Sequence, residues 1–459
     1  MSCGILGICL WAALLIRGSD WPMAMVSPTV LALTPFTFFV PWWLWKNVLR
    51  AWNRIQSCKA NTDSLQQERD EELSCKGSDS NTSVPSACEE READAPLQFS
   101  LRSVFLLIVA MAILFGGLRT KIAQIQRQRL AVERLGGPSA VELWNADFFH
   151  RHSTPAWLKP ILGEEYSADA HIHLQRDAIA DEDLAYLQYF LNDVNLTLEG
   201  GFGGDSLRFV GRARNIRWMC LDDNPVTDNG LQHLKGLRSL ESLSLASTEV
   251  TDAGLQYLSS LDGLWKLDLS GNQGVTDAGI VWLPGKRLGD LNFDDTGITD
   301  AALGRLRRLP SHLACANTEI TDLGLKYLED APMLMTLNLN GTRVTDEGLA
   351  YLRGCQRLIR LHLNGTRVTD AGLVHLAHLN RLNGLSLGNT RITDDGLAHL
   401  ADLKRLGELD LSNTDITDDG LKYLEYLQGL DELDLRGTKV TQQGIQQFKS
   451  PSWCTVQGP

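Results

Sequence analysis

Hydrophobic and polar residues follow one repeated pattern through the C-terminal half of the chain. The threonine of a recurring phrase, Val/Ile-Thr-Asp-x-Gly-Leu and its variants, falls at positions 227, 251, 276, 299, 321, 345, 369, 393, 417 and 441. In the copy that opens at Thr369, leucines follow at 373, 376, 379 and 382, and then at 385 and 387. A spacing of three indicates a helix and a spacing of two a strand. Each unit is therefore predicted to be a short helix followed by a short strand, here residues 384–388.

A unit of this length cannot bury its own leucines, so successive units must stack on one another. The pattern therefore predicts an α/β solenoid, with a parallel sheet on the concave side and short helices on the convex side, over residues 166–447. Residues 179–187 resemble a degenerate early unit. The two ends of such a stack need covers, which we expect from aromatic residues before the first unit and from residues 448–459, with Phe448 and Trp453, after the last.

The polar residues of the phrase are interpreted as structural. Either Thr393 or Asp394 is expected to accept a hydrogen bond from a first-turn N–H group of the helix that they open, and the carboxylate also suits the positive end of that helix. The small Gly396 is expected to allow close packing against the previous unit. A second threonine column, three residues before each phrase, is expected to donate hydroxyl hydrogen bonds within the loop between strand and helix. None of these positions suggests catalysis.

The first 120 residues hold the long apolar runs. Residues 1–55 are predicted to be hydrophobic membrane segments: 4–16 suits either a signal segment or a span, and 21–45 is uncharged but contains four prolines. Residues 56–96 are polar and acidic and are predicted to be a disordered linker. Residues 97–120 are predicted to be a transmembrane helix bracketed by Arg102 and Arg119. Residues 121–165 are then expected to form a juxtamembrane helix and an N-terminal cap.

Membrane topology stays open at this point, because basic clusters follow both the second apolar run and the last one. The side of the membrane that the repeats occupy is therefore undecided.

Charge and cysteine usage exclude some classes of function. The formal net charge of -13 and the pI near 5.3 argue against nucleic acid as a partner, because phosphate binding needs a basic face. Nine cysteines occur without a CxxC pair, so neither a zinc site nor a disulfide framework is indicated. His171 and His173 lie at strand spacing but lack a third ligand. No metal and no cofactor is predicted.

The repeat phrase resembles the leucine-rich repeats of membrane-anchored planctomycete proteins. The segments FSLRSVFLLIVAMAILFGG, RQRLAVERLGG and PAWLKPILGEEY extend the resemblance over about residues 97–447, as anchor, juxtamembrane helix and entry segment. The phrase is also similar to the repeats of eukaryotic F-box adaptor proteins, but nothing in this chain resembles an F-box. The resemblance implies a bacterial binding scaffold attached to the lipid bilayer by N-terminal helices, and it supplies no catalytic residues.

The concave face is the candidate binding site, because a curved parallel sheet is the surface that solenoids commonly use. The residue between the paired leucines of each strand should face it. Most of these side chains are small and polar, which suits a modest interface. The predicted partner-binding residues are Trp218, Asp268, Asn292, Thr336, Asn338, Asn340, Arg360, His362, Asn364, Glu408, Asp410 and Asp434.

The sequence predicts a non-enzymatic scaffold or receptor-like protein in the membrane that binds another protein through its repeats. An enzyme is not expected, since catalytic groups converge in a cleft and these repeats supply an open arc. The alternative is a cell-surface sensor or regulator that binds a glycan or small ligand. A solvated face with no ligand would use the same residues.

Overall fold

The computed structural model describes residues 101–144, 169–285, 287–449, 451 and 453–458. The predicted membrane segments at 1–55 and the predicted linker at 56–96 lie outside these residues, as do residues 145–168, which include most of the predicted N-terminal cap. Phe99–Pro459 form one compact unit, and the fold of this unit is described below.

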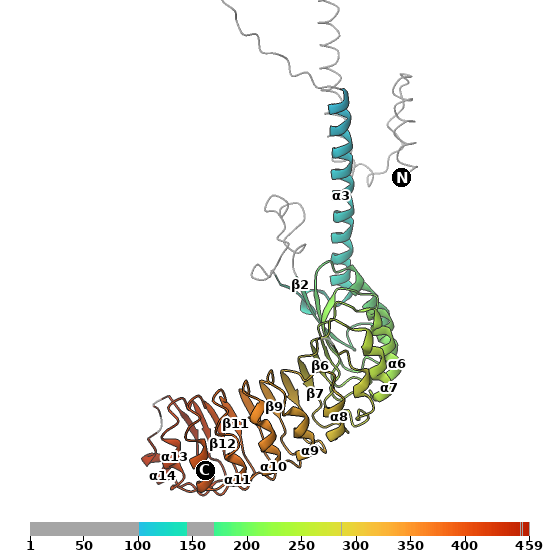
Figure 1. Ribbon diagram of the computed structural model, residues 1–459. Coiled ribbons are helices and arrows are strands. Elements are labelled where there is room, and N and C mark those ends of the chain that lie inside the picture. Colours follow the sequence, from blue (N-terminus) through green and yellow to red (C-terminus); the bar gives the residue numbers. More distant parts are fainter. Residues whose placement is uncertain (1–100, 145–168, 286, 450, 452, 459) are drawn as a thin grey trace, which may run out of the picture. The chain divides into compact units, whose positions relative to one another are not determined.

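The strands of this unit form a single sheet in which each strand pairs with its neighbours in the sequence (Figure 1). The first pair, β1 and β2, is antiparallel, and all later pairs are parallel. The described strands are β1 (Val141–Trp144), β2 (Asp169–Gln175), β3 (Val194–Glu199), β4 (Ile216–Cys220), β5 (Ser242–Ser244), β6 (Lys266–Asp268), β7 (Asp290–Asn292), β8 (His312–Ala314), β9 (Thr336–Asn338), β10 (Arg360–His362), β11 (Gly384–Ser386), β12 (Glu408–Asp410), β13 (Glu432–Asp434) and β14 (Thr455–Gln457).

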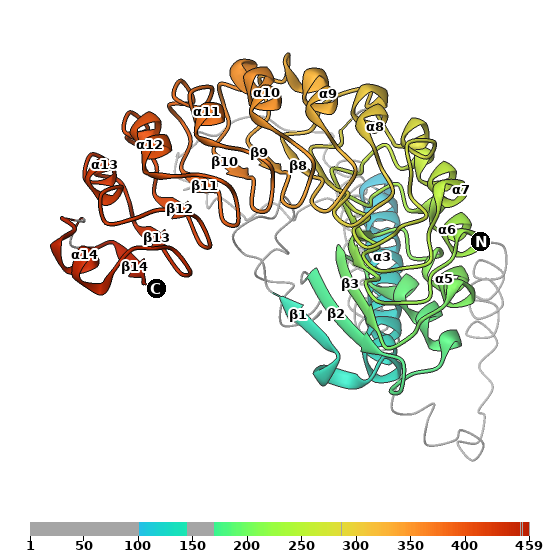
Figure 2. The same ribbon diagram turned by 90° about the horizontal axis from the view of Figure 1, so that it is seen from below.

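Short helices return the chain from one strand to the next. They line the convex side of the arc while the strands line its concave side (Figure 2), which confirms the predicted solenoid. The α-helices are α3 (Leu101–Arg134), α5 (Gly204–Val210), α6 (Asp228–Leu231), α7 (Asp252–Leu255), α8 (Asp300–Arg305), α9 (Asp322–Leu325), α10 (Asp346–Leu349), α11 (Asp370–Leu373), α12 (Asp394–Leu397), α13 (Leu421–Leu424) and α14 (Gln442–Gln447). The 3-10 helices are η1 (Gly137–Ser139), η3 (Asp181–Tyr189), η4 (Gln232–Gly236), η5 (Gln256–Ser260), η6 (Ile280–Trp282), η7 (Lys326–Leu328), η8 (Ala350–Gly354) and η9 (Ala398–Leu400).

Helix α3 covers the first turn of the solenoid with its C-terminal end. Ala131 and the following Leu135 are fully buried there, and the guanidinium of Arg134 lies over the ring of Tyr186 on η3 at 5.9 Å. Within the residues that the structure describes, no helix combines the length and apolar content needed to cross a bilayer, so the transmembrane helix predicted at 97–120 finds no support in α3.

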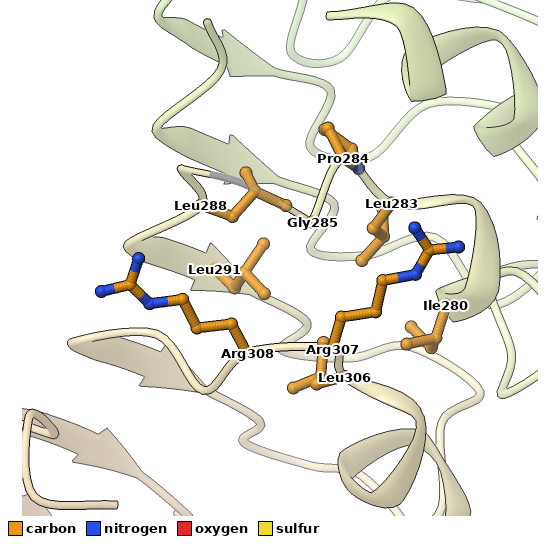
Figure 3. Close-up of a pocket in the computed structure, with 9 residues that line it drawn as sticks. All are labelled: Ile280, Leu283, Pro284, Gly285, Leu288, Leu291, Leu306, Arg307 and Arg308. Carbon is orange, nitrogen blue, oxygen red and sulfur yellow. The ribbon is translucent and has the colours of Figure 1, made fainter. Parts of the chain in front are cut away.

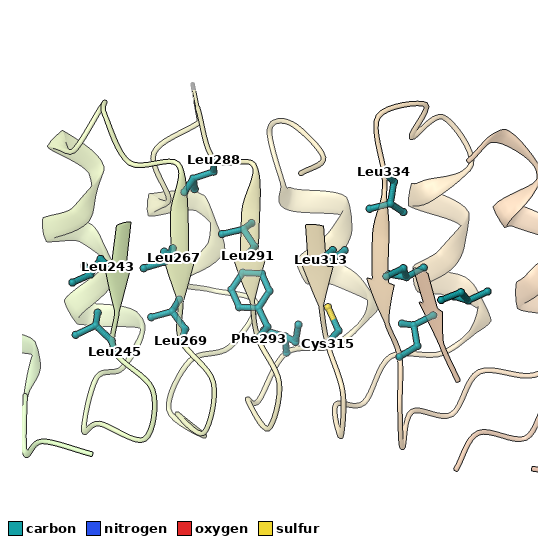
Figure 4. Close-up of a cluster of buried hydrophobic side chains, with 14 of the residues drawn as sticks. Leu243, Leu245, Leu267, Leu269, Leu288, Leu291, Phe293, Leu313, Cys315 and Leu334 are labelled. Carbon is teal, nitrogen blue, oxygen red and sulfur yellow. The ribbon is translucent and has the colours of Figure 1, made fainter. Parts of the chain in front are cut away.

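Two rows of buried side chains form the core under the sheet. Each coil contributes the central residue of its strand to one row and the residue directly after the strand to the other, as in the pairs Leu243 with Leu245 and Leu267 with Leu269 (Figure 4). Directly after β7 and β8 the second row contains Phe293 and Cys315 instead of leucines, and both are fully buried. A large and a small side chain in adjacent coils keep the volume of the core filled.

The free thiols at leucine positions are buried, as the sequence predicts. Burial raises the pKa of Cys315, and it raises the pKa of Cys355 to about 11, so both thiols stay protonated at neutral pH. These cysteines therefore act as small apolar residues of the core.

A hydrogen-bonded ladder joins successive coils at the start of each helix. The aspartate of one phrase accepts both the backbone N–H and the hydroxyl of the threonine in the next phrase; for Asp394 and Thr417 these distances are 2.9 and 2.5 Å. The same bonds join the pairs 228–251, 252–276, 277–299, 300–321, 322–345, 346–369, 370–393 and 418–441. Thr251, Thr321 and Thr369 cap their own helices in the way expected of Thr393. Thr393 itself makes no side-chain cap hydrogen bond, so the prediction is wrong for the residue on which it was made. The alternative cap, the aspartate, is not used in this way, because its carboxylate accepts hydrogen bonds from the next coil.

The glycine of the phrase makes room for this ladder. A Cβ atom at Gly396 would collide with the carboxylate of Asp370 in the preceding coil, and one at Gly420 with that of Asp394. The expectation that Gly396 permits close packing is therefore confirmed. Most threonines of the second column are buried, and their hydroxyls donate to the carbonyl three residues earlier, as Thr366 does to Leu363 at 2.7 Å.

Candidate functional site on the concave face

The parallel register aligns most of the predicted binding residues in two columns on the concave face. Thr336, Arg360 and Glu408 belong to the first column, and Asn338, His362 and Asp410 belong to the second. Ser386, between His362 and Asp410 in the second column, is half-buried like most residues of this face. The buried leucines that alternate with these columns point the polar side chains away from the core.

Two polar bridges cross a complete coil on this face. Arg360 pairs with Glu408 at 2.6 Å, and the amide of Asn364 donates to the carboxylate of Asp410 at 2.9 Å. The coil that the two bridges cross has glycine at two positions of this face, Gly384 and Gly388. A Cβ atom added at Gly384 would stand 3.2 Å from Arg360 Cγ, and one added at Gly388 would stand 3.1 Å from Asp410 Oδ2. The glycines leave space for the bridges, which hold four predicted site residues in fixed positions.

His362 lies beside the bridges and stays neutral at physiological pH. Its Nδ1 is 2.9 Å from the hydroxyl of Ser386. Burial lowers the pKa of His362 below its ordinary 6.5, and the positive charge of Arg360 adds to this effect. Because the unfolded chain binds the proton more tightly, the contribution of His362 to stability is complete above pH 6.5 and is lost as the pH falls through the folded pKa.

We expect the substitution Arg360→Gln to raise the pKa of His362, because it removes a repulsive positive charge and frees the carboxylate of Glu408, whose charge raises this pKa. The measurement is an NMR titration of the His362 ring proton in both proteins. Arg367→Gln, which removes an exposed arginine from the loop after the same strand, serves as the control and should leave the titration unchanged. A lower or identical pKa in the Arg360 variant would contradict the assignment.

A third set of polar contacts continues the face toward earlier coils. The amide of Asn338 donates to Asp294 at 3.1 Å across one intervening coil, and the side chain of Asn340 accepts from the N–H of Asn364 at 2.8 Å. Burial raises the pKa of Asp294, and the nearby carboxylates Asp295 and Asp268 add to it. Asp294 belongs to this network although the sequence analysis did not select it.

The remaining predicted residues lie apart from the bridges. Asp268 and Asn292 bond each other at 3.0 Å. Asp434 is paired with Arg436, whose hydrogen bonds lower the pKa of Asp434. Trp218 is 57% exposed. It is in register with Ser242 of β5 and Lys266 of β6, several strands away from Arg360. The structure therefore places the twelve residues on one face but divides them into separate groups.

Sequence reasoning missed the second exposed tryptophan of this face. Trp265 precedes β6, is 48% exposed, and meets the ring of His312 edge-on with 6.4 Å between centroids. Its indole lies across the backbone of the next coil, because Gly289 has no side chain to block it. A tryptophan in one unit followed by a glycine at the same position of the next unit was the available signal.

His171 and His173 bind separate neighbours on β3. His171 is 3.1 Å from the amide of Asn195, and His173 is 3.1 Å from the carboxylate of Glu199. Among the residues that the structure describes, no three histidine, cysteine or acidic side chains come together as metal ligands.

Comparisons with known proteins identify the repeats. The family model described as Leucine Rich repeat matches residues 236–259, 264–281, 331–352 and 406–424. No curated protein matches the chain.

Similar solved structures include an internalin (inlF) of Listeria monocytogenes, with 19% identity, a TM-score of 0.47 and coverage of 64% of this chain and 87% of that one. A leucine-rich-repeat protein of Leptospira interrogans gives 15% identity, a TM-score of 0.40 and coverage of 66% and 92%. The ectodomain of the receptor kinase GASSHO1/SCHENGEN3 of Arabidopsis thaliana, solved with CASPARIAN STRIP INTEGRITY FACTOR 2, gives 16% identity and a TM-score of 0.41, with coverage of 64% and 38%.

The repeated phrase, the coil-by-coil stacking of strand and short helix, and the matching family model agree. The solenoid of this chain contains leucine-rich repeats.

Proposed function

We propose that this chain is a non-enzymatic scaffold or receptor-like protein that binds a protein partner on the concave face of its repeats. The observation that carries the proposal is the pair of bridges from Arg360 to Glu408 and from Asn364 to Asp410. They hold charged and amide groups in place at a half-exposed surface before any partner arrives. Such preorganisation lowers the entropy cost of binding, which otherwise offsets much of the contact energy.

The chemistry of the face favours a protein surface over a substrate. Amide, carboxylate and guanidinium groups alternate along an open sheet, which suits hydrogen bonds with backbone and polar side chains of a partner. The acidic net charge of the chain opposes a nucleic acid.

Membrane attachment is part of the same proposal. The uncharged run at residues 21–45 is long enough to cross a bilayer, and the resemblance to planctomycete anchored repeat proteins implies an N-terminal anchor. The repeats would then be held near the membrane, on a side that the proposal leaves open.

The test uses site-specific photo-crosslinking of the full chain in cells. We expect a photoreactive residue at Ser386, between the two bridges, to give a discrete crosslinked protein, while one at the exposed Ala371 on α11 gives none. Crosslinking from Ala371 alone, or binding of glycans without a protein crosslink, would contradict the proposal. In the same samples, release of the complex by alkaline carbonate would contradict the anchor.

A further inference from the structure

Two consecutive coils are shorter than the rest, and this shortening opens the core. The phrases at Thr276, Thr299 and Thr321 are separated by 23 and 22 residues instead of 24. In the first of these coils, Pro284 and Gly285 come soon after η6. Regular coils have further leucines, three residues apart, in this part of the unit. In the second shortened coil, Pro310 stands three residues before Leu313 of β8, where regular coils have a leucine. As a result Leu306 and Leu309 are only half-buried, whereas the equivalent leucines of regular coils are fully buried.

A small apolar cleft lies between the shortened coils (Figure 3). Leu283, Leu288, Leu291 and Leu306 contribute to its apolar surface, and Arg307 and Arg308 stand at its rim. The two arginines extend in opposite directions from neighbouring positions (Figure 3), so that a guanidinium lies on either side of the apolar residues. The cavity volume of about 10 Å³ is no more than the space of about one water molecule, so neither a free metabolite nor a whole side chain fits inside, and a partner can only pack over the mouth of the cleft.

Arginines at one repeat position extend from this cleft along the loops that precede the strands. Each stands directly before the last leucine that precedes the strand of its coil. They are Arg287, Arg308, Arg357, Arg381 and Arg405. We call them the arginine row. With neighbouring strands about 4.8 Å apart, the five steps from Arg287 to Arg405 extend over about 24 Å. All five are exposed, and none forms an ion pair with another described residue.

Carboxylates lie in the same turns as the arginine row but do not pair with it. Glu329, Asp330 and Asp402 make no ion pair with the row in the described part of the chain. At the coil where the row is interrupted, Met333 is 52% exposed, and Arg357 approaches its sulfur at 3.1 Å. The edge therefore presents positive charge and apolar surface together.

We propose that the arginine row and the cleft bind an extended acidic segment of a partner protein, with one aliphatic side chain packed over the apolar mouth of the cleft. The planar guanidinium matches a carboxylate in a bidentate geometry. Exposed ion pairs alone are weak, so the apolar side chain supplies the selectivity. A single-stranded nucleic acid would need aromatic platforms for its bases, and none of the five row positions is aromatic. This site goes beyond the concave-face proposal, since it uses the loop edge of the coils.

The test is fluorescence polarisation of the full chain with a fluorescein-labelled peptide of sequence EDDLDEE in low salt. We expect saturable binding that weakens about tenfold when the central leucine of the peptide is replaced by serine. The double substitution Arg307→Gln and Arg308→Gln should weaken binding about fivefold. Both arginines are exposed, so the variant keeps its fold, which circular dichroism verifies.

The matched control is the double substitution Arg367→Gln and Arg391→Gln. It removes the same charge from exposed positions on the loops at the other end of the strands, and it should leave binding unchanged. Equal binding of the leucine and serine peptides, or equal weakening by both double variants, overturns the proposal. So does tighter binding of phosphatidylserine vesicles or oligo(dT) than of the peptide. The crosslink at Ser386 is independent of all these outcomes.

Discussion

The substitution Leu325→Ala is expected to lower the free energy of unfolding by about 2–5 kcal/mol, as large-to-small changes in well-packed cores do. Leu325 closes helix α9 and is fully buried in the continuous core. Its neighbouring coils cannot collapse into the space, because the ladder of Asp300, Thr321 and Asp322 fixes their separation. The measurement is urea unfolding of the full chain followed by far-UV circular dichroism.

Leu323 on the same helix is the control for this prediction. It is 68% exposed, so Leu323→Ala should change stability by less than about 0.5 kcal/mol. Similar losses in the two variants would mean that α9 does not bury one face against the sheet.

The substitution Asp394→Ala is expected to destabilise the solenoid by about 2–3 kcal/mol, because it removes two hydrogen bonds to a charged acceptor. The N–H and hydroxyl of Thr417 lose their partner, and the N–H is left half-buried. The same unfolding experiment measures the loss.

The adjacent Asp395→Ala removes an equal charge from an exposed side chain that makes no hydrogen bond to other described residues. We expect it to change stability by less than about 0.5 kcal/mol. If both aspartate variants lose the same stability, the effect is one of net charge and the ladder is not stabilising.

The sequence was sufficient for the solenoid, though not for the helix predicted to cross a membrane at 97–120, because the signals of the solenoid are local and repeated. The spacing of Leu373, Leu376 and Leu379, followed by that of Leu385 and Leu387, predicts helix and strand within one unit, and the period of 24 predicts the stacking. The target of Asp394 could not be derived in this way. Both Asp394 and Thr393 suit the cap of the same helix, and only the distance between coils decides which oxygen the next threonine reaches.

The candidate site was predictable as a face but not as a set of contacts. Alternation with buried leucines places Arg360 and His362 on the concave side, whatever the details of packing. The pairing of Arg360 with Glu408 depends on rotamers that pass over Gly384. Even so, the separation of 48 residues, two periods of 24, was a usable signal. The orientation of the Trp265 side chain also depends on a glycine in another unit, Gly289, and was not predicted.

Four successive units, from Thr345 to Thr441, have the same length, and each is joined to the next by the same aspartate-to-threonine bonds. Each junction is therefore chemically equivalent, and recombination between any two of them would join matching ends. Such an array can gain or lose whole segments by gene duplication or deletion without a new hydrogen-bonding arrangement. The two shortened coils are joined by the same bonds but differ in length, so a duplication of a regular unit would reproduce the junction and would not reproduce the cleft.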